Sequence, residues 1–355
     1  MINAPETEVL KISESEPLSG LLVLSAGFED RALEFISNID MDKNTRIILV
    51  KFLNEISNNE EIYRKYCNII SESICEDNLI TVVLKKDRPR DYSIDLGASL
   101  VNIPREINQM WVDISGMPSH MICATLQILR SYKPAYKLNL IYTSAKSYHP
   151  NKIEFNKLKK NQAEGIEYLP ASLAREMSEN LILNKFSGQR TNEGRSCLAL
   201  FAGYEVHRSI GVIENVNPSI LLLMYGKPEG DGLEWRLDLS RQLHKKFEKT
   251  RKSAVEEVST LYLKDSIDYL NQYYEYIYDE YDLTIAPVCS KMHAVAAYLF
   301  WEAYEEVQLI FPLPVGYETE RKAENVGQTY ITILESKSSL FRDPLELSIS
   351  NSQIK

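Results

Sequence analysis

The sequence predicts an α/β protein made of two tandem Rossmann-like repeats, each with a mainly parallel five-stranded sheet and helices on both faces. Two observations support this fold class. Short apolar runs alternate with segments of helical spacing along most of the chain, and parallel strands need such a crossover helix between them. The same order of elements then occurs a second time, after a polar connection.

The first repeat is expected over residues 18–150. It begins with the continuous apolar run 21–24, which ends in a turn of small residues and is followed by helical spacing from Glu29 onward. The opening residues 1–17 are polar and are expected to form an arm. Four further strands, separated by helices, are expected at 46–52, 79–84, 110–112 and 138–143. Five strands and four helices in this alternation predict a doubly wound parallel sheet.

The second repeat is expected over residues 196–335, with strands at 198–202, 220–225, 255–260, 282–288 and 307–311. Its first turn, at 202–205, has the same Ala-Gly-aromatic-Glu character as the turn at 26–29. Matched segments also occur later in both halves, at a spacing that decreases steadily, as small loop deletions in the second copy would produce. We therefore expect an internal duplication, with chance similarity between two ordinary α/β halves as the alternative.

A polar connection at residues 151–195 separates the two repeats. It contains a short helical pattern at 171–183 and a linker-like stretch at 187–194, where a domain boundary is expected. Residues 336–355 form a tail rich in serine and charged residues.

Composition limits the classes of protein to which the chain can belong. With 355 residues and a usual domain size of roughly 150 residues, two domains are expected. The net charge of −10 argues against direct nucleic-acid binding, which normally needs a basic surface. The five cysteines include no CxxC pair and the five histidines form no HExxH or HxH pattern, so neither a disulfide framework nor a metal site is expected. No apolar run approaches the roughly 20 residues of a membrane helix, and we expect a cytoplasmic protein.

The turns after the first strand of each repeat are candidate anion sites. The first repeat has Ser25, Gly27 and Arg31 there, and the second has Gly203 and Arg208. A glycine where a strand meets a helix lets a phosphate approach the backbone, and an arginine one turn later can bind it through two hydrogen bonds. The alternative is that each glycine only closes a tight turn. Neither GxGxxG nor GxxxxGK(S/T) occurs, and no cofactor is expected.

The segment 110–121, MWVDISGMPSHM, is the second candidate site because an apolar strand runs into a polar turn and then into a helix. Ser115, Gly116 and His120 are expected at the sheet edge where the first turn also ends. Ser290 and Lys291 stand at the equivalent place in the second repeat.

Three residues near these turns are candidate acids or bases. His120 and His293 lie close to the starts of their helices, and Glu29 lies in a first helical turn. A histidine titrates near neutral pH and can act as a general base. The alternative for both histidines is packing between helices. Tyr142, in the fifth strand, is a candidate for stacking on a nucleotide base.

The segment 113–121, DISGMPSHM, resembles the fourth-strand motif (D/N)xTGG(T)(K)xM of the CARF and SAVED group, which are Rossmann-like nucleotide sensors of bacterial antiviral systems. The segment 290–292, SKM, resembles a degraded second copy of this motif. The first copy departs from the pattern at Met117, in place of the second glycine, and at His120, in place of the basic residue. The resemblance covers both repeats and implies that a cyclic oligonucleotide or similar anion lies across the axis between them.

The resemblance therefore implies a sensor or regulatory subunit that binds a nucleotide-type anion and passes the signal to a protein partner with the effector activity. Two alternatives use the same scaffold. One is a hydrolase or phosphodiesterase that cleaves a nucleotide or NAD. The other is a scaffold subunit of a defence complex whose pocket is vestigial.

Overall fold

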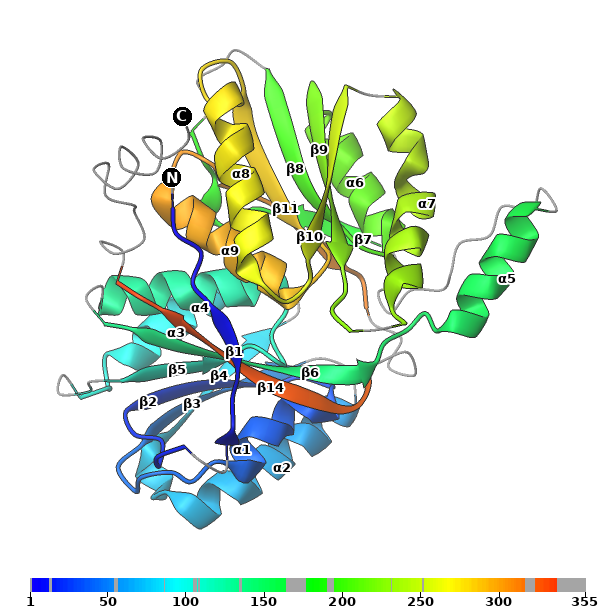
Figure 1. The fold of residues 1–355 in the computed structure, drawn as a ribbon. Coiled ribbons are helices and arrows are strands. Elements are labelled where there is room, and N and C mark those ends of the chain that lie inside the picture. The colour runs from blue at the N-terminus through cyan, green and yellow to red at the C-terminus, as the bar shows by residue number, and fades with distance from the viewer. Residues whose placement is uncertain are drawn as a thin grey trace, which may run out of the picture.

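A computed structural model describes residues 2–12, 15–53, 57–85, 87–104, 107, 109–133, 136–163, 177–189, 195–230, 232–250, 252–316 and 323–336. Figure 1 shows two α/β units, with helix α5 (Lys152–Ala163) extending away from them. The strands form a seven-stranded, a five-stranded and a two-stranded sheet. No helix in these residues is long and apolar enough to span a membrane.

The larger sheet contains the five parallel strands predicted for the first repeat. They are β2 (Leu21–Ala26), β3 (Arg46–Leu53), β4 (Leu79–Lys85), β5 (Met110–Asp113) and β6 (Leu138–Ser147). Their order in space is β6-β5-β2-β3-β4. The central strand β2 is buried along its whole length, as expected for a parallel strand with helices on both faces. The helices of this unit are η2 (Asp30–Leu33), α1 (Glu34–Asn38), α2 (Ser57–Ser73), η3 (Glu76–Asn78), α3 (Asp91–Leu100) and α4 (Ser119–Tyr132).

Two additional strands extend this sheet from five strands to seven. Strand β14 (Glu324–Leu334) pairs antiparallel with β6, and β1 (Thr7–Val9) pairs antiparallel with β14. The sequence assigned residues 324–334 to the second repeat and the opening residues to an arm. In the structure both complete the first sheet, because the open edge of β6 leaves backbone groups that a returning segment can pair with.

The second unit has a five-stranded, entirely parallel sheet in the order β10-β9-β8-β11-β12. These strands are β8 (Ser196–Ala202), β9 (Ile220–Lys227), β10 (Ser253–Ser259), β11 (Asp282–Pro287) and β12 (Gln308–Leu309). The accompanying helices are α6 (Val206–Val216), α7 (Glu234–Thr250), α8 (Leu263–Ile277) and α9 (Lys291–Ala303). Counted along the chain, the parallel strands of both units lie in the order third, second, first, fourth, fifth. The predicted α/β class with parallel sheets is confirmed.

The connection between the units contains a strand where the sequence predicted a helix. Strand β7 (Met177–Leu181) pairs antiparallel with β13 (Phe311–Pro314) and is followed by η4 (Asn184–Phe186). The helical expectation for 171–183 is therefore wrong over the strand, because β13 offers its backbone a pairing partner. Residues 171–176 lie outside the described residues, and so does the tail beyond residue 336.

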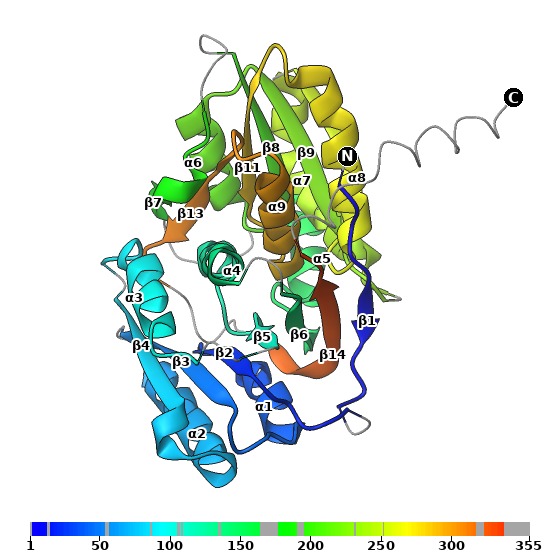
Figure 2. The same ribbon diagram turned by 90° about the vertical axis from the view of Figure 1, so that its left-hand side faces the viewer.

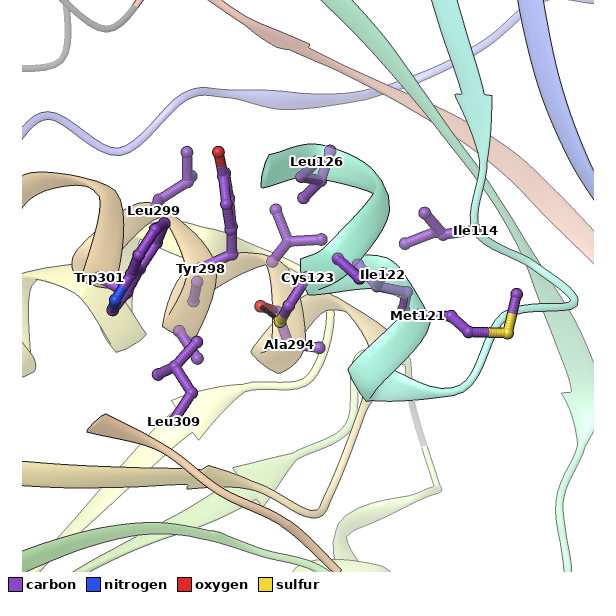
Figure 3. Close-up of a cluster of buried hydrophobic side chains, with 14 of the residues drawn as sticks. Ile114, Met121, Ile122, Cys123, Leu126, Ala294, Tyr298, Leu299, Trp301 and Leu309 are labelled. Atoms are coloured by element: carbon purple, nitrogen blue, oxygen red, sulfur yellow. Dashed lines mark hydrogen bonds between the residues drawn. The ribbon is translucent and has the colours of Figure 1, made fainter. Parts of the chain in front are cut away.

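The two units share a continuous core through the helices that follow their fourth strands. Helix α4 and helix α9 pack together, and most of their side chains are buried (Figure 3). The thiol of Cys123 on α4 donates to the backbone carbonyl of Ala294 on α9 at 3.4 Å. A helix that is apolar on most sides must be covered on most sides. The sheets and the partner helix provide that cover.

The N-terminal segment ties the units together a second time. Asn271 of α8 donates from Nδ2 to the carbonyl of Ile2 at 3.1 Å, and the Ile2 N–H lies 3.3 Å from Asn271 Oδ1. From Ile2 the chain runs past the second unit to β1 in the larger sheet (Figure 2). One short segment therefore contacts both units.

Two turns of the first unit touch each other through glycine backbones. A Cβ atom at Gly27 would lie 2.8 Å from the Gly116 carbonyl oxygen, and one at Gly116 would overlap the Ser25 carbonyl oxygen. The turn after β2 and the turn after β5 can therefore approach this closely only because neither residue has a side chain.

Gly116→Ala should lower the free energy of unfolding by about 1–3 kcal/mol, since an added methyl group must displace backbone in a packed region. Chemical denaturation measures this change. Gly97→Ala in α3 is the matched control, because an added Cβ there meets no atom within 4 Å and a helical alanine stabilises by about 0.5–1 kcal/mol. Equal stabilities for the two variants would contradict the close contact.

Candidate functional site

A cavity of about 580 Å³ lies between the two units. It is bordered by β6, by the turns after β2 and β5 in the first unit, by the turns after β8, β9 and β11 in the second unit, and by the start of α7. Ligands of open α/β sheets bind outside the carboxyl ends of the strands, and small-molecule sites usually have volumes of about 300–1,000 Å³. The cavity is therefore the candidate functional site.

The structure brings most of the residues predicted as ligand-binding into the wall of this cavity. Those in the wall are Gly27, Arg31, Gly116, Tyr142, Gly203, Arg208, Ser290 and Lys291, with Glu29 among them. Those outside the wall are Ser25, Ser115, His120 and His293. The wall therefore combines residues from both units.

The two serines outside the wall hold the corner of the first unit together. Ser115 Oγ accepts a hydrogen bond from the Thr143 N–H at 2.8 Å, and the Ser115 N–H donates to Asp113 Oδ1 at 2.8 Å. Ser25 Oγ donates to the Gly116 carbonyl at 3.4 Å. Both serines are buried. This role depends on β6 lying beside β5, which the sequence of the corner does not show.

His293 is held inside the second unit by two backbone groups. Its Nε2 donates to the Ser259 carbonyl at 2.9 Å, and its Nδ1 accepts from the Ser290 N–H at 3.3 Å. The ring stacks on Phe201 with 4.5 Å between centroids. Burial lowers the pKa of His293 to about 4, and the Ser259 carbonyl opposes this only in part. Both ring nitrogens are used, so the packing alternative describes this residue.

His120 also lies apart from the main cavity. The His120 and Phe311 rings lie edge to face, with 6.5 Å between their centroids. His120 also borders a separate void of about 10 Å³, which has room for about one water molecule. Burial, and to a lesser extent the charge of Arg208, lowers the pKa of His120 to about 4. The packing alternative describes this histidine too.

Arg31 and Arg208 occupy matching places in the two units and have matching partners. Arg31 Nη2 lies 2.7 Å from Glu29 Oε2, and its Nη1 donates to a backbone carbonyl of β6. Arg208 Nη1 lies 2.8 Å from Glu205 Oε2, and its Nη2 donates to a backbone carbonyl of β13 at 3.1 Å. Each predicted anion-binding arginine is thus joined to a glutamate and to the strand region that closes its unit.

The Arg31–Glu29 pair is ionised and buried. Burial alone would raise the pKa of Glu29, but the charges of Arg31 and Lys291 hold it below its ordinary value. Burial alone would lower the pKa of Arg31, but the Glu29 carboxylate raises it. A phosphate contact from Arg31 would therefore have to replace an existing ion pair, and Glu29 is a weak base.

Lys291 is the first residue of α9 and reaches across to the first unit. Its Nζ donates to the Met117 carbonyl at 2.7 Å. Burial lowers the pKa of Lys291 to about 8; Glu29 opposes this change and Arg31 adds to it. A lysine ammonium has three donors, and in the described part of the chain this hydrogen bond uses one of them. The remaining donors are available at the cavity wall.

Arg236, the third residue of α7, is a cavity residue that the sequence reasoning missed. Its guanidinium donates to the three successive carbonyls of residues 148–150 at 2.9–3.3 Å. Three rings lie 5.2–5.8 Å from it, those of Tyr148, Tyr204 and Trp235. Among the described residues, no carboxylate lies within ion-pair distance. The sequence Trp-Arg at the start of a helix has no distinctive spacing, so only the tertiary structure reveals this arginine.

The cavity wall is basic although the protein is acidic. Its described residues include six basic side chains (Arg31, Lys146, Lys152, Arg208, Arg236 and Lys291) and three acidic ones (Glu29, Glu205 and Glu229). Seven aromatic residues share the wall, namely Phe28, Phe52, Tyr142, Tyr148, Tyr204, Trp235 and Tyr330. The chain as a whole has a net charge of −10. Positive charge is therefore concentrated at this site.

The helices α4 and α9 both begin at the cavity. Residues 117–119 before and at the start of α4, and residues 289–291 before and at the start of α9, line its wall. Helix N-termini carry partial positive charge and unpaired N–H groups, both of which favour anions. Ser290 caps α9 by accepting a hydrogen bond from the His293 N–H, whereas Pro118 leaves α4 without a side-chain cap.

The described residues contain no group of three histidine, cysteine or acidic side chains that would suit a metal ion. All five cysteines are free. Cys289 lines the cavity, and burial raises the pKa of its thiol to about 12. At neutral pH it is a thiol and not a nucleophilic thiolate.

Comparison with known proteins gives distant structural likenesses. No protein-family model matches the chain, and no curated protein matches it. A solved structure titled as a Type III CRISPR defence DNA nuclease activated by cyclic oligoadenylate is similar over 82% of this chain, with 10% identity and a TM-score of 0.44. The chain spans 64% of that protein's length. The N-domain of a bacterial malonyl-CoA reductase with NADP is similar over 81% of this chain and 80% of its own, with 7% identity and a TM-score of 0.23.

Arg31→Ala should lower the free energy of unfolding by about 3–5 kcal/mol, because it leaves the Glu29 carboxylate buried without its partner. Urea denaturation measures the loss, and Glu29→Gln combined with Arg31→Ala should recover part of it. Arg64→Ala is the control, since that side chain is 75% exposed and its ion pair with Glu60 is on the surface. If Arg31→Ala and Arg64→Ala lower the free energy of unfolding equally, the Arg31–Glu29 ion pair is not buried.

Asp113→Asn should make stability less dependent on pH between 4 and 7. Burial raises the pKa of Asp113 to about 6, with the Ser115 hydrogen bonds opposing. The folded protein thus favours the protonated acid. The stability that this preference adds is fully present below the ordinary pKa of 3.8, and it is lost as the pH rises through 6. Each pKa unit is worth 1.36 kcal/mol, so the variant should gain about 3 kcal/mol relative to wild type between these limits.

Chemical denaturation at pH 4, 5, 6 and 7 tests this prediction. Asparagine can still accept the Ser115 hydrogen bond through Oδ1, so the corner should keep its shape. Parallel stability profiles for the variant and the wild type would show that Asp113 does not titrate in this range.

Proposed function

We propose that this protein is a sensor or regulatory subunit that binds a nucleotide-type anion in the cavity between its two units. The observation that carries the proposal is the wall of that cavity, which combines an excess of basic side chains with seven aromatic residues in an acidic protein. Basic groups and helix N-termini stabilise phosphate charge, and aromatic rings stack on bases.

The resemblance of the segment 113–121 to the CARF and SAVED motif supports cyclic oligonucleotides as the ligand class and bacterial antiviral defence as the setting. In that setting a protein partner supplies the effector activity. The concentration of positive charge within a cavity of about 580 Å³ fits a small anion better than a long nucleic acid, which needs an extended basic surface.

The two alternatives have less support from the described residues. Of the acids and bases predicted for a hydrolase, His120 and His293 lie outside the cavity wall and Glu29 is paired with Arg31. The other carboxylates of the wall, Glu205 and Glu229, accept hydrogen bonds from Arg208 and Ser259. A scaffold with a vestigial pocket would need no concentration of charge in the wall. The basic wall therefore favours a binding protein.

Isothermal titration of the full chain with cyclic oligonucleotides, nucleoside phosphates and NAD, combined with assay for products, tests the proposal. We expect binding without turnover. Lys291→Gln should weaken binding at least tenfold, since it removes a cation that has no carboxylate partner among the described residues. Lys264→Gln, on the exposed face of α8 and paired with Asp268, is the control and should bind like the wild type.

The possible results separate the three functions. Conversion of a ligand to products would favour the hydrolase. Absence of binding by every ligand would contradict the proposal and favour the scaffold. An equal effect of Lys291→Gln and Lys264→Gln on affinity would place the ligand outside this cavity.

A further inference from the structure

The wall of the cavity is symmetric in one respect. Arg31 and Arg208 follow the first strand of each unit, and each is paired with its own glutamate. The two pairs are electrically balanced. They shape the two sides of the cavity alike but contribute little net charge to it.

In another respect the wall is asymmetric. Arg236 and Lys291, the partly buried cations that have no carboxylate partner among the described residues, both belong to the second unit. Lys291 is the first residue of α9, and the first residue of α4 is Ser119. Arg236 is the third residue of α7, and the third residue of α2 is Asn59. The matching positions in the first unit also line the cavity but are neutral.

The aromatic residues have the opposite distribution. Three rings, those of Tyr148, Tyr204 and Trp235, already surround the Arg236 guanidinium. The other four come from the first unit and its extended sheet, and they are Phe28, Phe52, Tyr142 and Tyr330. The second unit thus contributes the partly buried cations that are unpaired among the described residues, whereas Lys146 and Lys152 of the wall are exposed, and the first unit contributes the larger stacking surface.

We propose that the cavity recognises a single-ended nucleotide, whose terminal phosphate group lies between Arg236 and Lys291 and whose base stacks on the aromatic residues of the first unit. This inference rests on the proposed binding of a nucleotide-type anion in the cavity, and it names a linear nucleotide in place of the cyclic oligonucleotide that the motif resemblance implies. A two-fold symmetric ring would present identical phosphates to two walls that differ in charge.

The charges of the two phosphate types support this choice. A terminal phosphate carries a charge of about −1.5 to −2 at pH 7, whereas each phosphate of a ring is a diester with one negative charge. Two cations of the cavity wall without carboxylate partners among the described residues, one on α7 and one on α9, match the charge of the terminal group. The planar guanidinium of Arg236 can also donate two parallel hydrogen bonds to phosphate oxygens.

Isothermal titration of the full chain with three groups of probes tests the inference. The probes are the four ribonucleoside 5′-diphosphates, the four matching nucleosides, and the rings cyclic di-AMP and cyclic di-GMP. We expect at least one diphosphate to bind ten times more tightly than its nucleoside and than either ring. Arg236→Gln and Lys291→Gln should each weaken diphosphate binding at least tenfold.

Two further variants separate recognition from a structural role of Arg236. Arg241→Gln alters an arginine of the same helix that lies outside the cavity wall and pairs with Glu257, and it should bind like the wild type. Arg236→Lys keeps the charge and should recover part of the affinity that Arg236→Gln loses. If Arg236→Lys and Arg236→Gln lose the same binding affinity, for diphosphates and nucleosides alike, then Arg236 only supports residues 148–150.

Failure of this inference can be told apart from failure of the proposed function. If a ring binds as tightly as any diphosphate and Arg236→Gln leaves its affinity unchanged, the single-ended ligand is excluded while the nucleotide sensor stands. If no probe and no other nucleotide binds, both are excluded.

Discussion

The packing of α4 against α9 is the constraint on which the rest of the structure depends. Each helix follows the fourth strand of its own unit and therefore begins at the carboxyl end of that unit's sheet. When the two helices bury their apolar surfaces against each other, these two sheet edges are brought face to face. The small residue Ala294 allows the backbones to approach within reach of Cys123. The cavity is the space that remains where the two edges meet, so its position follows from the burial of these helices.

The contents of the cavity follow from a different constraint, the need to compensate buried charge. Arg31 and Arg208 each pair with a glutamate close by in the chain and donate to a backbone carbonyl from the end of their unit. These ion pairs make the wall locally neutral. Among the described residues, Arg236 and Lys291 donate hydrogen bonds only to backbone carbonyls, and neither has a carboxylate partner. A charge that has no opposite partner is the part of the site with most to gain from an anion.

The two units are also joined by segments of the chain that contact both of them. Strand β14 leaves the second unit and returns along β6, and β1 then covers β14 while Ile2 remains bonded to Asn271. The two units are therefore connected both through β14 and through the N-terminal segment. The segment 148–150, held by Arg236, is the point where the cavity meets the connection to α5.

The sequence by itself determined the elements and the edge of the sheet at which a site would form. Alternating apolar runs and helical segments reflect local burial, so the parallel strands, the turns at Gly27 and Gly203, and the turn at 287–291 that leads into α9 could be predicted from short stretches. Tertiary structure alone decided what these residues contact. Ser115 and His293 became internal supports because β6 and β10 lie beside them, and residues 324–334 joined the first sheet because β6 had an open edge. Arg236 entered the site because α7 faces the other unit, and long-range packing of this kind leaves no periodic pattern in the sequence.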